Sequence, residues 1–135
     1  MSFPTALLSH PYLMAAAGGA IGSVARVVVT DTMARFMGER FPFGTLAVNV
    51  SGAVLMGLLA GYGATEPGKL IFSPATRIFL MIGILGGYTT FSSFSLQTFL
   101  LLEQGNLSGA LLNVLLSVAL CLTGIWVGFF TIRAF

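Results

Sequence analysis

Long uncharged, mostly apolar stretches alternate with short polar segments along this chain. Four stretches stand out, over residues 11–25, 41–65, 78–102 and 104–132, and the first continues past Arg26 to Thr30. Each can cross the apolar core of a bilayer as a helix, which takes about 20 residues. The pattern predicts an all-α membrane protein with four transmembrane helices. Because four such spans use about 80 positions, only short connections remain, and residues 1–135 should form a single domain.

The composition excludes several functional classes. Hydrophobic residues make up 56% of the chain and charged residues only 7%, against about 25% charged residues in an average soluble domain. One cysteine (Cys121) and one histidine (His10) leave no disulfide framework, no cysteine metal site and no catalytic cluster, so we expect no enzyme activity. A net charge of +2 is too small for a nucleic-acid-binding surface. The lipid bilayer is the expected environment.

Basic residues divide equally between the two sides that four spans would define. The two sets are Lys69, Arg77 and Arg133 on one side, and Arg26, Arg35 and Arg40 on the other. An equal division gives little orientation preference under the positive-inside rule. We therefore predict dual topology, in which oppositely inserted chains pair as an antiparallel homodimer about a two-fold axis in the membrane plane. The alternative is that one basic residue near a span end outweighs the others and fixes a single orientation.

Glycines recur four residues apart in every predicted span. Such pairs allow helix backbones to approach closely in lipid, where no hydrophobic drive holds helices together. We expect these glycines to be mainly structural. The pairs are Gly18 and Gly22, Gly57 and Gly61, Gly83 and Gly87, and Gly124 and Gly128.

The third span contains a segment that disfavours a continuous helix. Gly86 and Gly87 are followed by Thr89, Thr90 and several serines, and these residue types have low helix propensity. A break in mid-membrane is therefore predicted, and it would free carbonyl oxygens that must find partners. In an antiparallel dimer, two such breaks could present oxygens to one monovalent cation. The alternative is a glycine-rich crossing point whose hydroxyls bond back to their own helix.

Two phenylalanines follow this segment. Phe91 and Phe94 are three residues apart and share a helix face. Aromatic rings are electropositive at their edges, so rings presented edge-on can attract a small anion. Simple packing of the two rings is the alternative.

Polar residues recur at helical spacing on the second and fourth spans. Such residues usually face the bundle interior or a wet cavity, where hydroxyl and amide groups can replace the hydration shell of an anion. Hydrogen bonds between helices are the alternative for each residue taken separately. The two stripes are Thr45, Asn49 and Gly52, and Asn113, Ser117 and Cys121.

Arg26 is the charged residue within the first apolar stretch, close to its expected end at Thr30. It either extends to the lipid headgroups or forms an electropositive entrance that attracts anions.

Three blocks of residues, in this order along the chain, resemble the Fluc (CrcB) family of fluoride channels. The third block, residues 86–94 with the double glycine, Thr-Thr-Phe-Ser and a second phenylalanine, is the most specific. The resemblance spans nearly the whole chain. The first two blocks are Gly18, Gly19, Gly22 and Arg26, and Gly44, Thr45, Leu46, Val48, Asn49 and Gly52.

The resemblance implies a dual-topology antiparallel homodimer with two pores and a central structural sodium ion. Gly86 and Thr89 would offer backbone carbonyls to sodium, and Phe91 and Phe94 would line the fluoride pathway. Asn49 would donate a hydrogen bond to fluoride beside the rings. The remaining implied positions are Thr45 and Ser117 along the polar track, Thr90 and Ser92 near the break, and Arg26 near the vestibule. Two departures from the family pattern are Asn113 in place of a tyrosine and Cys121 in place of a serine.

The expected function is that of a passive fluoride channel in the cytoplasmic (inner) membrane, which exports fluoride and confers fluoride resistance. Hydrogen fluoride enters cells as a neutral acid and ionises inside, and an inside-negative potential favours anion exit by about 2.3 kcal/mol per 100 mV. One rival, a small multidrug exporter, needs an intramembrane carboxylate, whereas the four acids lie at span ends or in loops. The other rival is a scaffold subunit without transport. The acids are Asp31, Glu39, Glu66 and Glu103.

Overall fold

The computed structural model describes residues 10–63 and 72–134, and every regular element in these ranges is helical. Four helical spans are long and apolar enough to cross a membrane: Pro11–Met37, Phe43–Gly63, Pro74–Glu103 and Leu107–Arg133. The predicted number of spans is therefore confirmed. Lys69 and Glu66, which entered the charge arguments, lie outside the described residues. The elements are α2 (Pro11–Met37), α3 (Phe43–Gly63), α4 (Pro74–Arg77), η1 (Ile78–Leu85), α5 (Gly86–Tyr88), α6 (Phe91–Glu103) and α7 (Leu107–Arg133).

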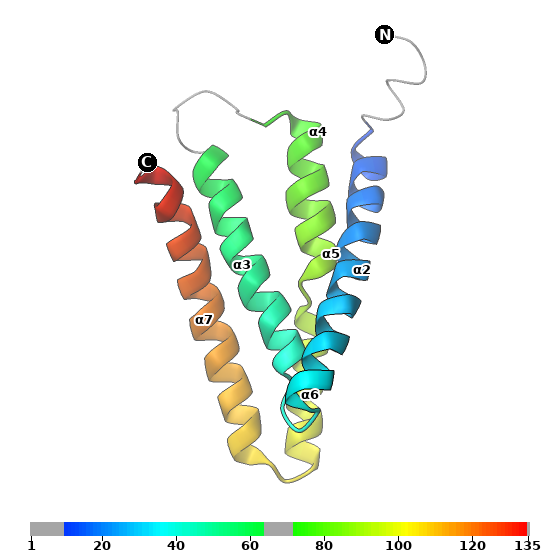
Figure 1. The fold of residues 1–135 in the computed structure, drawn as a ribbon, viewed down its shortest axis with the longest axis vertical. Helices are drawn as coiled ribbons and strands as arrows, with labels where there is room; N and C mark the ends of the chain where they lie inside the picture. Colours follow the sequence, from blue (N-terminus) through cyan, green and yellow to red (C-terminus); the bar gives the residue numbers. More distant parts are fainter. Residues whose placement is uncertain (1–9, 64–71, 135) are drawn as a thin grey trace.

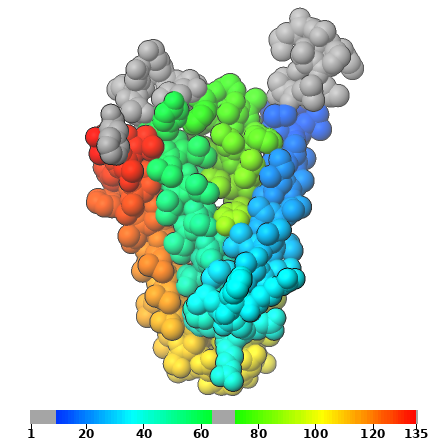
Figure 2. Space-filling view, viewed as in Figure 1, coloured from blue at the N-terminus to red at the C-terminus, as the bar shows by residue number. Residues whose placement is uncertain are grey.

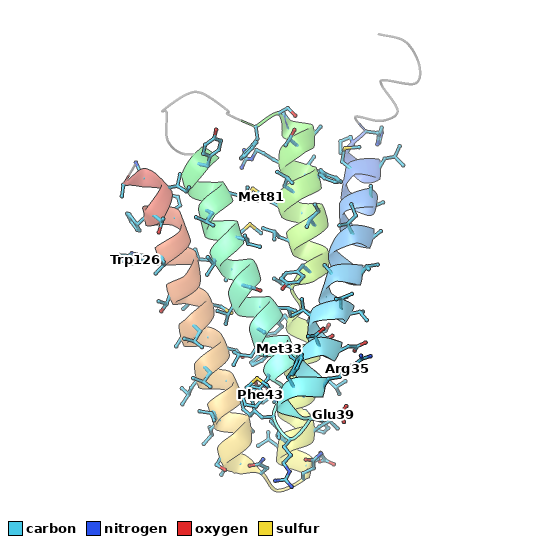
Figure 3. The ribbon with its side chains drawn as sticks, viewed as in Figure 1. Met33, Arg35, Glu39, Phe43, Met81 and Trp126 are labelled. Carbon is cyan, nitrogen blue, oxygen red and sulfur yellow. The ribbon has the colours of Figure 1, made fainter. Side chains whose placement is uncertain are left out.

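Successive spans run in opposite directions (Figure 1). α3 packs along α7, while α2 packs against the π-helical segment η1 and against α5. Figure 2 shows α3 in green beside α7 in orange on the face presented. The start of α2 and the end of α7 lie at one end of the bundle, and the α2–α3 and α6–α7 connections lie at the other. Arg35 and Glu39 lie at the second end (Figure 3), as the predicted order of spans requires.

The first helix is longer than its apolar stretch. α2 continues beyond Thr30 to Met37 and ends at Gly38, whose φ of 77° suits glycine. Residues 31–37 contain no glycine or proline that would stop the helix earlier. Arg26 therefore lies in the interior of α2, and its predicted place near a helix end is wrong.

The glycine pairs are sites of close helix contact, as predicted. A Cβ atom on Gly18 or Gly22 would collide with backbone atoms of η1. Gly57 and Gly61 likewise face the backbone of α7, and Gly128 faces that of α3. Because the glycines have no side chain, the backbones approach closely enough for extensive dispersion contact, which is a main source of helix association in lipid.

Large apolar side chains point outward from the bundle. Trp126 on α7 is 62% exposed and projects away from the other helices (Figure 3). Among the described residues, the buried apolar ones are instead few, namely Val48, Ala53, Leu85, Phe94, Leu101 and Ala110. This inside-out distribution is appropriate for a chain whose surface meets lipid rather than water.

The glycine packing leads to a first prediction. Gly22→Ala should lower the free energy of unfolding in detergent by about 1–3 kcal/mol, because the new methyl group meets the Ile84 carbonyl oxygen and neighbouring backbone atoms that cannot yield. Gly19→Ala on the same helix is the matched control, since a Cβ there has nothing within 4 Å. Equal stability of the two variants would contradict the packing argument.

Candidate functional site

The third span is broken at Thr89 and Thr90. Thr89 has φ −81° and ψ 156°, and Thr90 has φ −152° and ψ 114°, so both residues are extended between α5 and α6. The predicted break is confirmed, but Gly86 and Gly87 remain helical. Gly87 is required for a different reason: a Cβ atom at this position would lie 2.6 Å from the Gly19 carbonyl oxygen on α2. Gly87 thus serves helix packing, and the chain leaves the helix two residues later.

Asn49 on α3 bonds both backbone groups of Thr90. The Thr90 N–H donates to Asn49 Oδ1 at 2.8 Å, and Asn49 Nδ2 donates to the Thr90 carbonyl oxygen at 3.1 Å. In a continuous helix that N–H would bond the carbonyl of Gly86. The Asn49 amide therefore takes the place of helical hydrogen-bond partners for Thr90. Leaving the backbone N–H and carbonyl of Thr90 unpaired in an apolar environment would be costly.

Hydroxyl groups complete the hydrogen bonding around the break. The Thr90 side chain caps α6, because its Oγ1 accepts from the Ser93 N–H at 3.2 Å. Thr89 Oγ1 instead donates to the Leu85 carbonyl oxygen at 2.9 Å. Gly52 leaves room for the Thr89 methyl group, which a Cβ at position 52 would meet. The helix interruption and the hydroxyl bonding to the preceding turn, which the sequence offers as alternatives, therefore occur together.

A groove of about 400 Å³, named the inner cavity for its place beside the break, opens onto the surface of the chain, where its lining residues Phe91, Val118 and Leu122 are exposed. The two predicted rings meet at its wall, with centroids 5.3 Å apart and planes tilted by 46°. Phe94 is 9% exposed, whereas Phe91 is 78% exposed. Asn49, Ser117 and Thr90 bring polar groups from three different spans to the same space. The lining residues are Asn49, Gly52, Ala53, Met56, Thr89, Thr90, Phe91, Phe94, Ser117, Val118, Cys121, Leu122 and Ile125.

An outer cavity of about 560 Å³ lies toward the α2–α3 connection. Arg26 and Thr45 contribute to its lining, together with Asp31, Glu39 and Arg40. Thr90 lines both cavities. Arg26 thus lines the outer cavity from the middle of α2 rather than from its end, and its vestibule role stays a prediction.

Three predicted positions lie apart from the cavities. Gly86 and Ser92 line neither one, and Ser92 instead has its Oγ 3.2 Å from Thr90 Oγ1. Asn113 is 1% exposed and lies behind the inner cavity, where it bonds Thr98 and Ser117. The fourth-span stripe therefore divides into Ser117 and Cys121, which line the inner cavity, and Asn113, which does not.

Sequence reasoning missed a polar stripe along α6 and its C-cap residue, Gln104. Ser93, Gln97 and Gln104 all line the outer cavity. Their spacing of four and seven residues is that of one helix face, so the signal was present in the third span.

The contact between Asn49 and Thr90 generates a prediction. Asn49→Leu should lower the free energy of unfolding by about 1–3 kcal/mol, because both backbone groups of Thr90 lose their partners. The Thr90 amide should also exchange its hydrogen faster. Leu55→Met, at an exposed position of the same helix, should change stability by about 0.5 kcal/mol or less. Unchanged exchange at Thr90 would show that Asn49 does not hold the break.

Comparison with known proteins identifies the family. The sequence model described as "CrcB-like protein, Camphor Resistance (CrcB)" matches residues 13–129. The protein of Rhodospirillum rubrum named fluoride-specific ion channel FluC is 48% identical over 118 residues, which cover 87% of this chain and 90% of the relative. The protein of the same name from Rhodopseudomonas palustris is 47% identical over 123 residues, or 91% and 97% of the two chains.

A third relative of the same name, from Coxiella burnetii, is 51% identical over 111 residues, which cover 82% of this chain and 88% of the relative. These relatives are named as ion channels, so the prediction that the protein is not an enzyme is confirmed. The four apolar helices and the family together indicate a multi-pass membrane protein. The chain belongs to the CrcB family, as the resemblance of its three sequence blocks implied.

Proposed function

We propose that this protein is a fluoride-selective passive channel. The observation that carries the proposal is the inner cavity, in which two phenylalanine rings and neutral hydrogen-bonding groups meet at the helix break. The names of the relatives support it, because each is called a fluoride-specific ion channel.

The lining of the inner cavity suits a small, strongly hydrated anion. Asn49 has two N–H groups on its amide nitrogen, and one bond to the Thr90 carbonyl leaves the other available to an anion. Ser117 adds a hydroxyl, and the ring edges of Phe91 and Phe94 are electropositive. None of the lining residues is charged. Fluoride can therefore exchange its water for hydrogen bonds without being trapped by a fixed cation.

The rival exporter mechanism finds no support in this cavity. Proton-coupled export of a cation needs a carboxylate within the membrane. Asp31 and Glu39 line the outer cavity, but the inner cavity has no carboxylate among its lining residues.

An antiparallel homodimer is the second part of the proposal. Phe91 is 78% exposed although it belongs to the wall of the inner cavity. A second chain covering this ring would close the open side of the pathway. With Arg26 counted on the side of the outer cavity that it lines, the basic residues divide equally, which supports insertion in both orientations. A two-fold axis in the membrane plane would then give two equivalent pores.

Sodium is the third part of the proposal. The Gly86 carbonyl lacks its helical donor, because the Thr90 N–H bonds Asn49 instead, and Gly86 is exposed. The Thr89 carbonyl follows extended backbone and so leaves the helical direction. These neutral oxygens fit a hard monovalent cation, and two chains would supply four. A bound sodium would satisfy carbonyls that lipid cannot, and it would be structural rather than transported.

We further propose export of fluoride across the inner membrane, which would confer fluoride resistance. The neutral acid enters and ionises inside the cell, and a membrane potential of 100 mV favours anion exit by about 2.3 kcal/mol. Export by this route needs no coupling ion.

Ion flux from liposomes tests the channel function. The purified protein should release fluoride, measured with a fluoride electrode, and should release chloride far more slowly. Phe94→Ile should abolish fluoride flux, because an aliphatic side chain has no electropositive edge. Phe99→Ile is the matched control on the same helix, since Phe99 is exposed and lines neither cavity.

Three results would contradict the proposal in different ways. Equal release of fluoride and chloride would contradict the proposed selectivity. Undiminished flux in Phe94→Ile would contradict the proposed role of the rings in conduction. A complete lack of flux in the wild-type protein would favour the scaffold subunit.

Orientation reporters attached to the C-terminus test the dimer. We expect both orientations in similar amounts, because the basic residues give no preference. Purified dimers should also dissociate more readily when sodium is replaced by a large organic cation throughout purification. A single orientation in cells would exclude the antiparallel arrangement, and dimers indifferent to sodium would exclude the structural ion.

A further inference from the structure

A chain of side-chain hydrogen bonds connects α7 to α6 behind the inner cavity. Ser117 Oγ donates to Asn113 Oδ1 at 3.5 Å, and Asn113 Nδ2 donates to Thr98 Oγ1 at 2.9 Å. Thr98 Oγ1 donates in turn to the Phe94 carbonyl oxygen at 2.8 Å. The chain therefore begins at one cavity-lining residue, Ser117, and ends at the backbone of another, Phe94.

The direction of these bonds is determined at Thr98. A hydroxyl group has a single proton, and that of Thr98 is committed to the Phe94 carbonyl oxygen. Its oxygen can then only accept from the Asn113 side chain, so the amide nitrogen of Asn113 faces Thr98. The amide oxygen of Asn113 is consequently directed toward Ser117.

The bonds differ in strength along the chain. Distances of 2.8 and 2.9 Å are typical of well-formed hydrogen bonds, whereas 3.5 Å is at the long limit. Thr98 and Asn113 thus hold each other firmly, and Asn113 holds the Ser117 hydroxyl only weakly. Little is lost when the Ser117 proton turns away from Asn113 toward an anion in the inner cavity.

We propose that Asn113 and Thr98 are positioning residues for the anion pathway. Neither residue lines either cavity. Together they hold the turn of α6 that carries Phe94 against α7, and they keep the Ser117 hydroxyl oriented but easily released. The ligand they serve is a small anion that accepts hydrogen bonds. This inference rests on the proposed channel function and adds two residues to it.

Thr98→Val tests the inference, because valine has the same shape and no hydroxyl. Maximal fluoride flux should fall by about tenfold, which corresponds to about 1.4 kcal/mol in the barrier. Thr98→Ser, which keeps the hydroxyl, should restore the flux. Thr131→Val is the matched control, since Thr131 Oγ1 makes the same bond to its own helix, to Val127, at an exposed position.

A double variant separates positioning from stability. Thr98→Val alone leaves the buried Asn113 amide without its acceptor and should lower the thermal unfolding temperature. Adding Asn113→Leu removes the unpaired amide, so stability should recover. Flux should stay low in the double variant, because neither Phe94 nor Ser117 is then held. This variant also provides the test if Thr98→Val alone does not fold.

The outcomes distinguish this inference from the proposed function. Absence of fluoride flux in the wild-type protein would overturn the channel function itself. Wild-type flux together with equal flux in Thr98→Val and Thr131→Val would overturn only the positioning role. Flux that recovers with stability in the double variant would also overturn it, since packing alone would then explain the single variant.

Discussion

The paired hydrogen bonds between Asn49 and Thr90 are the interaction on which the site depends. A helix break within a membrane exposes backbone groups that lipid cannot bond. The Asn49 amide bonds both the N–H and the carbonyl oxygen of Thr90, which lowers the energetic cost of the break. The Gly86 carbonyl is left without its helical donor. The same residue also reaches the inner cavity. Structural support and a contribution to the proposed anion pathway therefore come from a single side chain.

Close glycine packing supplies the frame around this contact. Gly18 and Gly22 bring α2 against η1, and Gly57 and Gly61 bring α3 against α7. The interior is consequently narrow, with few large buried side chains. Space remains beside the break, where Gly52 leaves room for the Thr89 methyl group, and in the outer cavity toward the α2–α3 connection.

Much of this architecture could be predicted from sequence, because lipid imposes simple rules. Long uncharged runs can only be spans, and glycine pairs mark close crossings, so both predictions are confirmed. The residue at which the chain leaves the helix could not be predicted, because glycine is compatible with both helical and extended backbone. Only the structure shows that Gly87 packs against the backbone of Gly19. The polar stripe indicated that Asn49 faces inward, but its partner lies 41 residues away in the chain. Hydrogen bonds such as that between Asn113 and Thr98 likewise depend on how two spans are rotated relative to each other.

The extension of α2 to Met37 has a consequence for the environment of the pathway. A helix of 27 residues is about 40 Å long, which exceeds the roughly 30 Å of hydrocarbon in a bilayer. Unless the helix tilts, one or both of its ends therefore reach headgroup depth, and its C-terminal part places Asp31 and Ala34 on the wall of the outer cavity. Acidic phospholipids around this rim would lower the local concentration of anions. The surrounding lipid thus becomes a determinant of how often an ion arrives at the entrance.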